Sequence, residues 1–121
     1  MYASHLLGNK GEALAVEFLK KEDYIILEKN WNAGKLEIDI IALDNDQIVF
    51  VEVKTRSGNY LTTPESAVDN KKQKFIISAA DRYLKRNQID KECRFDIITL
   101  VKEKDGFIID HIKNAFYPTL Y

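Results

Sequence analysis

The sequence predicts one domain of mixed α/β (α+β) class, with helices packed on a mixed sheet, and three observations support this expectation. The chain has 121 residues, which is the length of about one domain. Its hydrophobic share of 45% is that of an ordinary globular protein. Helix and strand patterns follow one another in the order α-β-β-β-α-β-β, which is typical of helices covering a sheet. We therefore expect residues 1–121 to form a single domain.

The first predicted element is a helix from Leu6 to about Lys21, because apolar residues recur at intervals of three and four. Its expected inner face consists of Leu7, Leu14, Ala15, Phe18 and Leu19. Gly8 and Gly11 lie one turn apart, and glycines weaken a helix unless another element packs closely there. Glu12 lies beside the apolar stripe.

Three strands are expected next, because three segments are rich in β-branched residues and bounded by turn formers. They are residues 24–31, 36–43 and 47–55. The segment Asp44–Asp46 between the last two is typical of a tight hairpin turn. A polar loop is expected over residues 57–63.

A second helix is expected to begin at Thr63–Pro64, an N-cap followed by proline at the first helical position, and to end near Asn87. Its expected inner face consists of Val68, Phe75, Ile76, Ala79, Ala80, Tyr83 and Leu84. Two further strands are predicted over residues 94–101 and 107–112. Residues 114–121 are expected to be irregular.

Composition excludes several kinds of protein. No apolar run approaches the ~18–20 residues of a membrane span, so no membrane partner is expected. The first residues lack a basic stretch followed by a long apolar run, so no signal peptide is expected. Cys93 is the only cysteine, which excludes an internal disulfide and a cysteine-rich zinc site. With only two histidines as well, this composition fits the reducing cytoplasm.

Charge is divided unevenly along the chain, although the net charge is only -1. Residues 1–52 hold 5 Lys and Arg against 10 Asp and Glu, whereas residues 53–94 hold 10 against 5. An acidic half joined to a basic half suits a polyanion held next to a metal ion. Chance segregation of solvated charges is the alternative explanation.

Two acidic residues in the predicted hairpin point to a candidate site. If Asn45 and Asp46 form a two-residue turn, the numbers of paired residues sum to 91, so Asp39 stands opposite Glu52. Glu37, Asp39 and Ile41 are then expected on one face, and Glu37 opposite Lys54. A three-residue turn would instead put the two acids on opposite faces.

Opposed carboxylates inside apolar strands repel each other, so a positive group is needed to offset them. Asp39 and Glu52 offer hard oxygen ligands that suit Mg²⁺ or Mn²⁺. Lys54 lies on the face of Glu52 and can orient a water or stabilise charge on a phosphate. These are the parts of metal-assisted phosphodiester hydrolysis. The alternative is a ladder of ordinary ion pairs between Lys54 and the acids of the neighbouring strand.

The spacing from Asp39 through twelve residues to Glu52-Val53-Lys54 resembles the PD-(D/E)XK nuclease superfamily, whose restriction endonuclease-like core has the order α-β-β-β-α-β. More narrowly, the chain resembles the YraN-like family of small bacterial proteins, described as predicted endonucleases and similar to Holliday junction resolvases. The matching segments are Gly8-x-x-Gly11-Glu12-x-x-Ala15, Asn30-Trp31, Glu37–Ala42, Val49–Arg56, Pro64-x-x-Ala67-Val68, Lys72-Gln73 and Arg94-Phe95-Asp96.

The resemblance implies a role for each matching residue. Asp39 and Glu52 would hold the metal ion, with the carbonyl of Val53 as a further ligand. Lys54 would act on the attacking water, and Glu12 would be a further acid from the first helix. Lys72, Gln73 and Arg56 would contact phosphate or the site. For Glu12, Lys72 and Arg56 the alternative is a solvated surface position.

The resemblance implies a metal-dependent nuclease acting on DNA, including branched or damaged DNA. The competing hypothesis is a nucleic-acid-binding or assembly module that keeps the nuclease fold without turnover. One chain of this size covers little duplex, so two-strand chemistry would need a homodimer or a protein partner.

Lys20 and Lys21 are expected to lie apart from bound DNA. Trp31 is expected either in the core or as a base-stacking surface.

Overall fold

The computed structural model describes residues 2–57 and 68–118, with side chains from Asn9 onward. Within these residues, two helices and five strands follow the order that the sequence predicts. They are α1 Tyr2–Lys21, β1 Ile25–Ala33, β2 Leu36–Asp44, β3 Gln47–Ser57, α2 Asn70–Arg86, β4 Cys93–Glu103 and β5 Gly106–Phe116. Neither helix is long and apolar enough, over the residues described, to cross a membrane.

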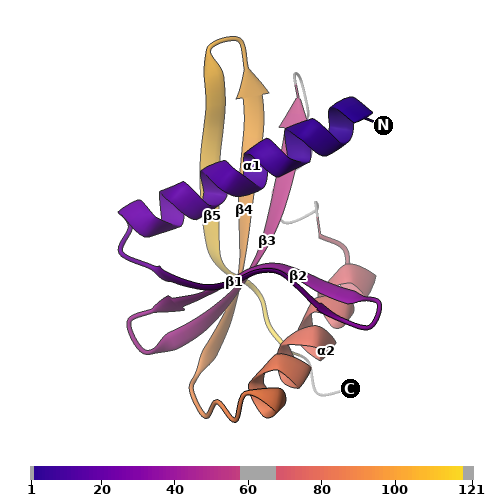
Figure 1. Cartoon of the computed structure of the whole chain (residues 1–121), viewed down its shortest axis with the longest axis vertical. Helices are drawn as coiled ribbons and strands as arrows, with labels where there is room; N and C mark the ends of the chain where they lie inside the picture. Colours follow the sequence, from indigo (N-terminus) through magenta and orange to yellow (C-terminus); the bar gives the residue numbers. More distant parts are fainter. Residues whose placement is uncertain (1, 58–67, 119–121) are drawn as a thin grey trace.

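The strands form one sheet in the order β1-β2-β3-β4-β5 (Figure 1). Strands β3 and β4 are parallel, and the other neighbours are antiparallel. A parallel pair needs a long crossover connection, and α2 lies within that connection. The mixed sheet flanked by helices is therefore confirmed.

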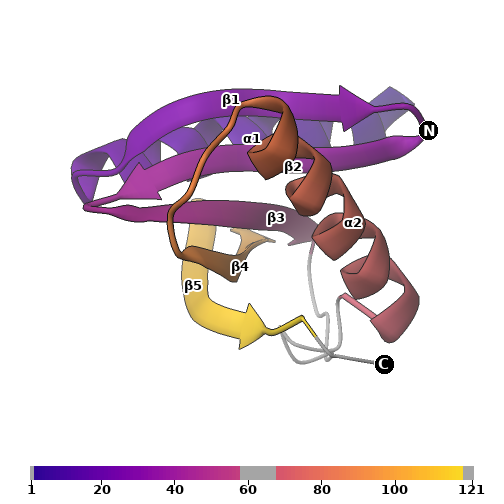
Figure 2. The same cartoon turned by 90° about the horizontal axis from the view of Figure 1, so that it is seen from below.

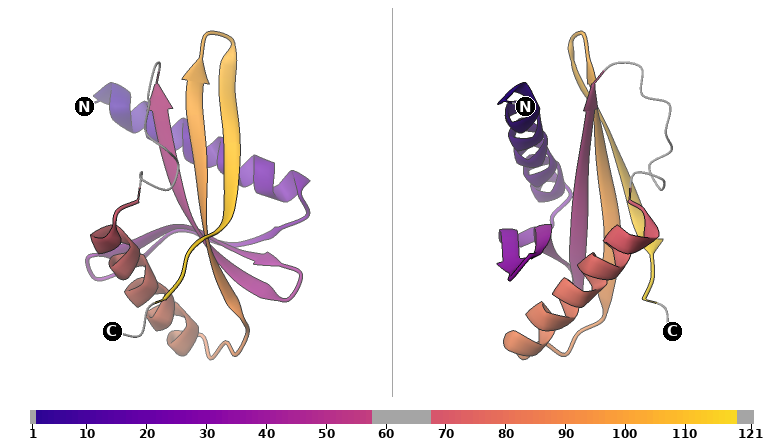
Figure 3. Two further views of the ribbon diagram at one scale, coloured as in Figure 1. Left: turned by 180° about the vertical axis from the view of Figure 1, so that it is seen from behind. Right: turned by 90° about the vertical axis from the view of Figure 1, so that its right-hand side faces the viewer.

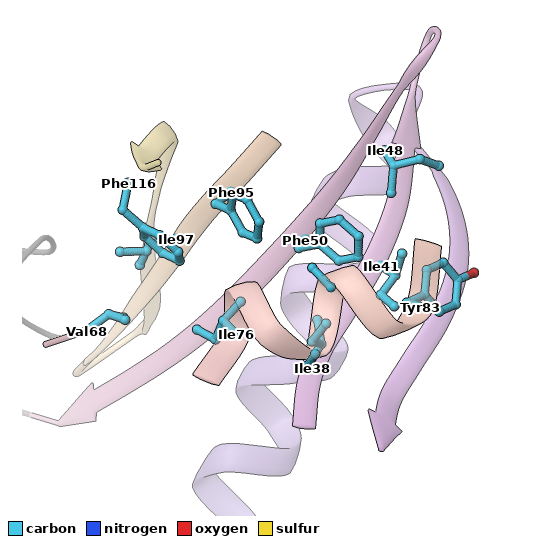
Figure 4. Packing of buried hydrophobic residues seen from close by; sticks show 12 residues of the cluster. Ile38, Ile41, Ile48, Phe50, Val68, Ile76, Tyr83, Phe95, Ile97 and Phe116 are labelled. Carbon is cyan, nitrogen blue, oxygen red and sulfur yellow. The ribbon is translucent and has the colours of Figure 1, made fainter. Parts of the chain in front are cut away.

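The two helices cover opposite faces of the sheet, as the alternation of side chains in β3 shows. Ile48 and Phe50 belong to a buried cluster with residues of α2 (Figure 4), whereas Val49 and Val51 belong to a second cluster with residues of α1. Figure 3 shows α1 along one side of the sheet, and Figure 2 shows α2 in front of β2. The side chains of β3 are therefore divided between two cores.

Helix α1 approaches the sheet closely at Gly11. A Cβ atom built on Gly11 would meet Thr55 Oγ1 of β3 at 2.0 Å. A side chain there would force Thr55 or α1 to shift, which favours glycine at this contact despite its low helix propensity. The prediction that Gly8 and Gly11 lie at the contact is confirmed for Gly11, and the surroundings of Gly8 lie outside the described part of the chain.

The predicted hairpin register is confirmed from the turn to Ile40 and Val51, but the predicted pairs of Asp39 with Glu52 and of Glu37 with Lys54 lie beyond the end of the ladder. Strands β2 and β3 pair from Asp44 and Gln47 to Ile40 and Val51 with numbers that sum to 91, so the loop is the two-residue turn Asn45–Asp46. Asn45 has φ of +53°, as such tight turns require. Beyond Ile40 the pairing stops, although β2 reaches back to Leu36 and β3 runs on to Ser57.

This end of pairing opens a gap between the two strands. Strands β1 and β2 turn away from β3, β4 and β5 (Figure 1). We call the opening between residues 36–39 of β2 and residues 52–57 of β3 the fork. Asp39 is the residue next to the last pair of the ladder, so it lies at the base of the fork.

Three details of the predicted elements are wrong. The predicted helix start at Thr63–Pro64 lies outside the described residues, but α2 begins at Asn70 because Asp69 is extended and its side chain accepts the N–H of Lys72. Phe75 was expected in the core, yet it is exposed, since Ile76 takes the inward position. The last strand continues to Phe116, because Phe116 stacks on Phe95 at 5.2 Å.

Trp31 packs in the core rather than forming an open surface. It is half-buried against the α2 cluster, and its ring meets Tyr83 edge-on at 5.2 Å. The guanidinium of Arg86 lies 5.7 Å from the ring centre. The core interpretation of Trp31 therefore holds.

A buried polar network ties β4 to its neighbours away from the fork. Asp96 is fully buried and accepts hydrogen bonds from Arg94, at 2.9 Å to each oxygen, and from the main-chain N–H of Asn114. His111 Nε2 lies 2.7 Å from the same carboxylate. Burial opposes ionisation of Asp96, but these donors outweigh it and lower its pKa. The network anchors β5 and the β2–β3 hairpin, which Arg94 reaches through Asp44 at 2.9 Å.

Candidate functional site

The Asp39 side chain lies at the base of the fork, where it takes the place of a main-chain hydrogen-bond acceptor. Its Oδ2 accepts a hydrogen bond from the N–H of Val53 at 2.8 Å. The N–H of Ile48 donates toward β4, to the carbonyl of Glu92, so by alternation the N–H of Val53 leaves β3 at the β2 edge. Strand β2 has already departed there, and the carboxylate supplies the missing acceptor.

Strand β2 loses its regular alternation at this point. Ile38 and Ile41 both pack in the α2 cluster, whereas Ile40 packs in the α1 cluster. Asp39 lines a groove beside α1, so the expectation that Asp39 and Ile41 share one face is wrong. The irregularity turns Asp39 toward the edge of β3, where its carboxylate meets Val53.

Glu52 is a buried ionisable group in the fork. It is only 4% exposed, and its Oε2 atom has no hydrogen-bond partner among the described residues. Burial is the largest cause of a rise in the pKa of Glu52 to about 8, and a hydrogen bond shared with Asp39 and the repulsion of its charge contribute to the same rise. Asp39 and Glu52 are therefore close enough to share a proton, and a cation can replace that proton.

Two lysines partly offset the charge of Glu52. Lys72 of α2 places its Nζ 3.4 Å from Glu52 Oε2, within ion-pair distance but without the alignment of a hydrogen bond. The charges of Lys72 and Lys54 both favour the ionised form and lower the pKa of Glu52. No described ion pair joins Lys54 to Glu37 or Asp39, so the ladder alternative finds no support.

Glu12 of α1 reaches the same region from the other side. Burial raises the pKa of Glu12, and the nearby charges of Asp39 and Glu37 raise it further. With its amide turned to satisfy both groups, Asn30 Nδ2 donates to Glu12 Oε2 at 3.2 Å and to Glu37 Oε1 at 3.3 Å. Glu12 is therefore part of an acidic cluster and not an isolated surface residue.

The role of Asn30 was missed by the sequence analysis. Asn30 has φ of +51° within β1, a backbone conformation that asparagine tolerates better than most residues. This conformation presents its amide to the acids Glu12 and Glu37. An asparagine within a predicted strand was the available signal, since asparagine is depleted in strands.

The two remaining predicted contacts lie at the margins of the site. Gln73 Nε2 donates to the carbonyl of Val68 at 3.0 Å and so steadies the chain ahead of α2. Arg56 is half-buried on β3, and its Nη1 donates to the carbonyl of Thr55 at 3.4 Å. By strand alternation Arg56 extends the face of Glu52 and Lys54.

The fork offers a divalent cation only a few protein ligands, which suits Mg²⁺. No group of three or more acidic, histidine or cysteine side chains in the described residues is arranged to hold a metal ion. Mg²⁺ commonly binds through one or two carboxylates and keeps several waters. Asp39 and the unbonded Oε2 of Glu52 supply two hard oxygens, and the carbonyl of Val53 leaves β3 at the same edge as its N–H.

A groove extends from this site along α1. It has a volume of about 340 Å³ and lies between one face of α1 and strands β1 and β2. Its lining residues include the acids Glu12, Glu17 and Asp39 and the lysines Lys20 and Lys29. We call it the α1 groove. Lys20 was expected to lie apart from bound DNA, whereas the structure places it in a groove that contains Asp39.

Comparison with known proteins gives a consistent family. Residues 11–100 match the sequence model described as "Uncharacterised protein family UPF0102". A UPF0102 protein of Bacteroides thetaiotaomicron is 50% identical over 115 residues, which cover 95% of each chain. UPF0102 proteins of Parabacteroides distasonis and Bacteroides fragilis are 49% and 46% identical, over 92% and 100% of each chain.

Proposed function

This chain belongs to the uncharacterised protein family UPF0102, and from the acids gathered in its fork we propose that it is a divalent-metal-dependent nuclease that hydrolyses phosphodiester bonds in DNA. One observation carries the proposal. Glu52 is buried beside a second carboxylate with one oxygen unbonded, an arrangement that is costly unless a cation binds there. The α-β-β-β-α-β order and the Asp39…Glu52-x-Lys54 spacing support placement in the PD-(D/E)XK superfamily.

In this proposal Asp39, Glu52 and the carbonyl of Val53 hold one Mg²⁺ or Mn²⁺. When bound, the ion would polarise the phosphate and lower the pKa of a water. The N–H of Val53 fixes the carboxylate of Asp39, so this ligand is oriented before anything binds. Glu52 must be deprotonated to act as a ligand, and the charges of Lys72 and Lys54 assist its ionisation.

Lys54 and Glu12 act on the water and the phosphate. Lys54 is half-buried, and its charge already acts on Glu52, so its ammonium can orient a water at the phosphate or stabilise negative charge as that charge develops. Glu12 reaches the site from α1 and can accept a proton from the water, because its pKa is raised toward neutrality. Arg56 and Lys72 would contact neighbouring phosphates.

The test is incubation of the purified protein with single-stranded, duplex, nicked and four-way DNA in the presence of Mg²⁺, Mn²⁺ or EDTA. We expect cleavage of at least one form with Mg²⁺ or Mn²⁺, none in EDTA, and none by Asp39→Asn with either metal. Cleavage by Asp39→Asn equal to that of the wild type would trace the activity to a contaminant and refute the proposal.

A binding module without turnover is the second candidate, and one contact favours it. The ammonium of Lys72 already lies 3.4 Å from Glu52, so part of the charge is balanced without a metal. In that case DNA would bind equally well in Mg²⁺ and in EDTA. Metal-dependent tightening of DNA binding, together with cleavage, separates the nuclease from this alternative.

A further inference from the structure

The α1 groove has the size of a site for a small ligand or a single strand. Its volume of about 340 Å³ lies at the lower end of the ~300–1,000 Å³ typical of ligand pockets. One wall consists of residues that recur every three or four positions along α1, from Asn9 to Lys20. The other wall is formed by β1 and β2. A duplex, whose major groove alone is ~12 Å wide, can only lie across the opening.

The charge of the α1 groove changes along its length. Glu12 and Asp39 lie at the fork, Lys29 lies beside Ile40, with which it pairs, and Lys20 lies two turns of α1 beyond Glu12. Both lysines are exposed, and neither forms an ion pair with a carboxylate of the described residues. Glu17 also lines the groove, so the lysines are not part of a uniformly basic surface. The two lysines can therefore accept an anion.

The length between the two ends matches a short run of nucleotides. Glu12 and Lys20 are eight residues apart on α1, which corresponds to about 12 Å along a helix. At the ~3.4 Å rise per nucleotide of one strand, this distance corresponds to about three nucleotides. Val16 and Ile40 lie between the ends and are 7% and 1% exposed. They form the apolar floor of the groove between its charged residues.

We propose that the α1 groove binds a short single strand of DNA, whose phosphates are held by Lys29 partway along the groove and by Lys20 about three nucleotides from the fork. The groove thereby selects a substrate class, namely DNA with a single-stranded tail or branch next to the bond that is cut. Only this assignment to the bond that is cut rests on the proposed nuclease function. Binding of the strand itself depends on the groove alone.

Lys20 and Lys21 form a matched pair for the test. They are neighbouring, exposed lysines in the last turn of α1, but only Lys20 lines the groove. Binding of a fluorescein-labelled oligothymidylate of eight nucleotides is measured in EDTA, where no metal-dependent cleavage occurs. We expect Lys20→Glu and Lys29→Glu each to weaken binding about tenfold and to lower the salt slope by about 0.7. Lys21→Glu should change affinity less than twofold.

Substitution of two acidic residues provides a second measurement, in which the expected effect is a gain of affinity and not a loss. Glu17→Gln removes a negative charge that faces the strand and should raise affinity about threefold, whereas Glu22→Gln, outside the groove, should not. Equal effects of Lys20→Glu and Lys21→Glu, or of the two glutamine variants, would overturn the proposal. Competition by thymidine 5′-monophosphate as strong as that of the oligonucleotide would also overturn it, since the site would then be a nucleotide pocket.

Cleavage assays separate this proposal from the nuclease proposal. If the wild type cuts tailed DNA at least tenfold faster than blunt duplex, and Lys20→Glu removes that preference, both stand. If blunt duplex is cut as fast and Lys20→Glu has no effect on binding, the groove proposal fails and the nuclease stands. If nothing is cut with any metal but binding still depends on Lys20, the nuclease proposal fails and the groove stands.

Discussion

The carboxylate of Asp39 accepts the main-chain N–H of Val53 at 2.8 Å, across the point where β2 and β3 stop pairing. A side chain thus completes a main-chain ladder at its end. The same carboxyl lies against Glu52 and raises the pKa of Glu52, whose burial is the larger cause of the shift. Where the two strands separate, they leave an opening beside two neighbouring carboxyl groups, and a cation would neutralise the negative charge of these groups.

Glu52→Gln should stabilise the metal-free protein at high pH. The pKa of Glu52 is raised from 4.5 to about 8, so the folded state favours the protonated form. That stability is complete below about pH 4.5 and is lost as the pH rises through 8. At about 1.4 kcal/mol per pKa unit, the variant should exceed the wild type by roughly 2–4 kcal/mol at pH 8 in EDTA. Urea unfolding at pH 4.5, 6 and 8 measures this difference.

The two proteins should converge near pH 4.5, and added Mn²⁺ should stabilise only the wild type. A variant that is less stable than the wild type at pH 8 in EDTA would show that Glu52 is an ordinary ion-pair partner of Lys72. In that case the ion pair at 3.4 Å would be the reason for the buried carboxylate.

Lys54→Ala should lower turnover far more than substrate binding. Its ammonium is proposed to act on charge that develops during the reaction, and loss of one such group costs about 10²–10³ in kcat. Arg56→Ala is the matched control, because Arg56 lies two residues further along the same face of β3 and is proposed to contact phosphate. It should raise KM and leave kcat within about threefold. Equal losses in kcat and KM for Lys54→Ala would make Lys54 a phosphate contact only.

Much of the site followed from the sequence because period-two alternation and a two-residue turn are local rules. They gave the register that the structure has as far as Ile40 and Val51, which brings Asp39 and Glu52 to the end of the ladder. The irregularity between Ile38 and Ile41 was not predictable, because it depends on where β2 leaves β3 and on Asn30 at positive φ. The exposure of Phe75 was missed because Phe75 and Ile76 are adjacent apolar residues, and only packing against the sheet decides that Ile76 is the buried one.

Glu12→Gln should weaken metal binding less than Asp39→Asn. Glu12 acts from α1 beside the acids, and substitutions of such supporting groups typically cost about 10–100-fold in metal affinity. We expect about tenfold for Glu12→Gln and a larger loss for Asp39→Asn, measured by calorimetric titration with Mn²⁺. In the wild type, affinity should fall as the pH is lowered from 8 to 6, because burial raises the pKa values of both Glu52 and Glu12. A pH-independent affinity would place the metal elsewhere.

Asp96→Asn should destabilise the fold strongly without a direct effect on the fork. Asp96 is fully buried and pairs with Arg94 at 2.9 Å, and breaking a buried pair costs about 3–5 kcal/mol. Asp46→Asn is the control, since Asp46 is 92% exposed in its pair with Lys91 and should cost at most about 1 kcal/mol. The pKa of Asp96 is lowered, so this stability is present above the unfolded pKa of about 3.8 and is lost as the pH falls through the folded value. Equal urea midpoints for the two variants at pH 7 would contradict this account.

Gly11→Ala should destabilise the protein, although alanine is the better helix former by about 1 kcal/mol. The new Cβ would lie 2.0 Å from Thr55 Oγ1, so α1 must move away from β3, at a net cost of roughly 1–3 kcal/mol. Glu12 follows Gly11 directly, and the shift should therefore also lower the rate of DNA cleavage. Thr55→Ala removes the Oγ1 atom and leaves the Thr55 Cβ at 3.1 Å, so the double variant should recover most of the lost stability. A double-mutant cycle by urea unfolding measures this coupling, and additive effects of the two substitutions would show that Gly11 does not set the distance between α1 and the sheet.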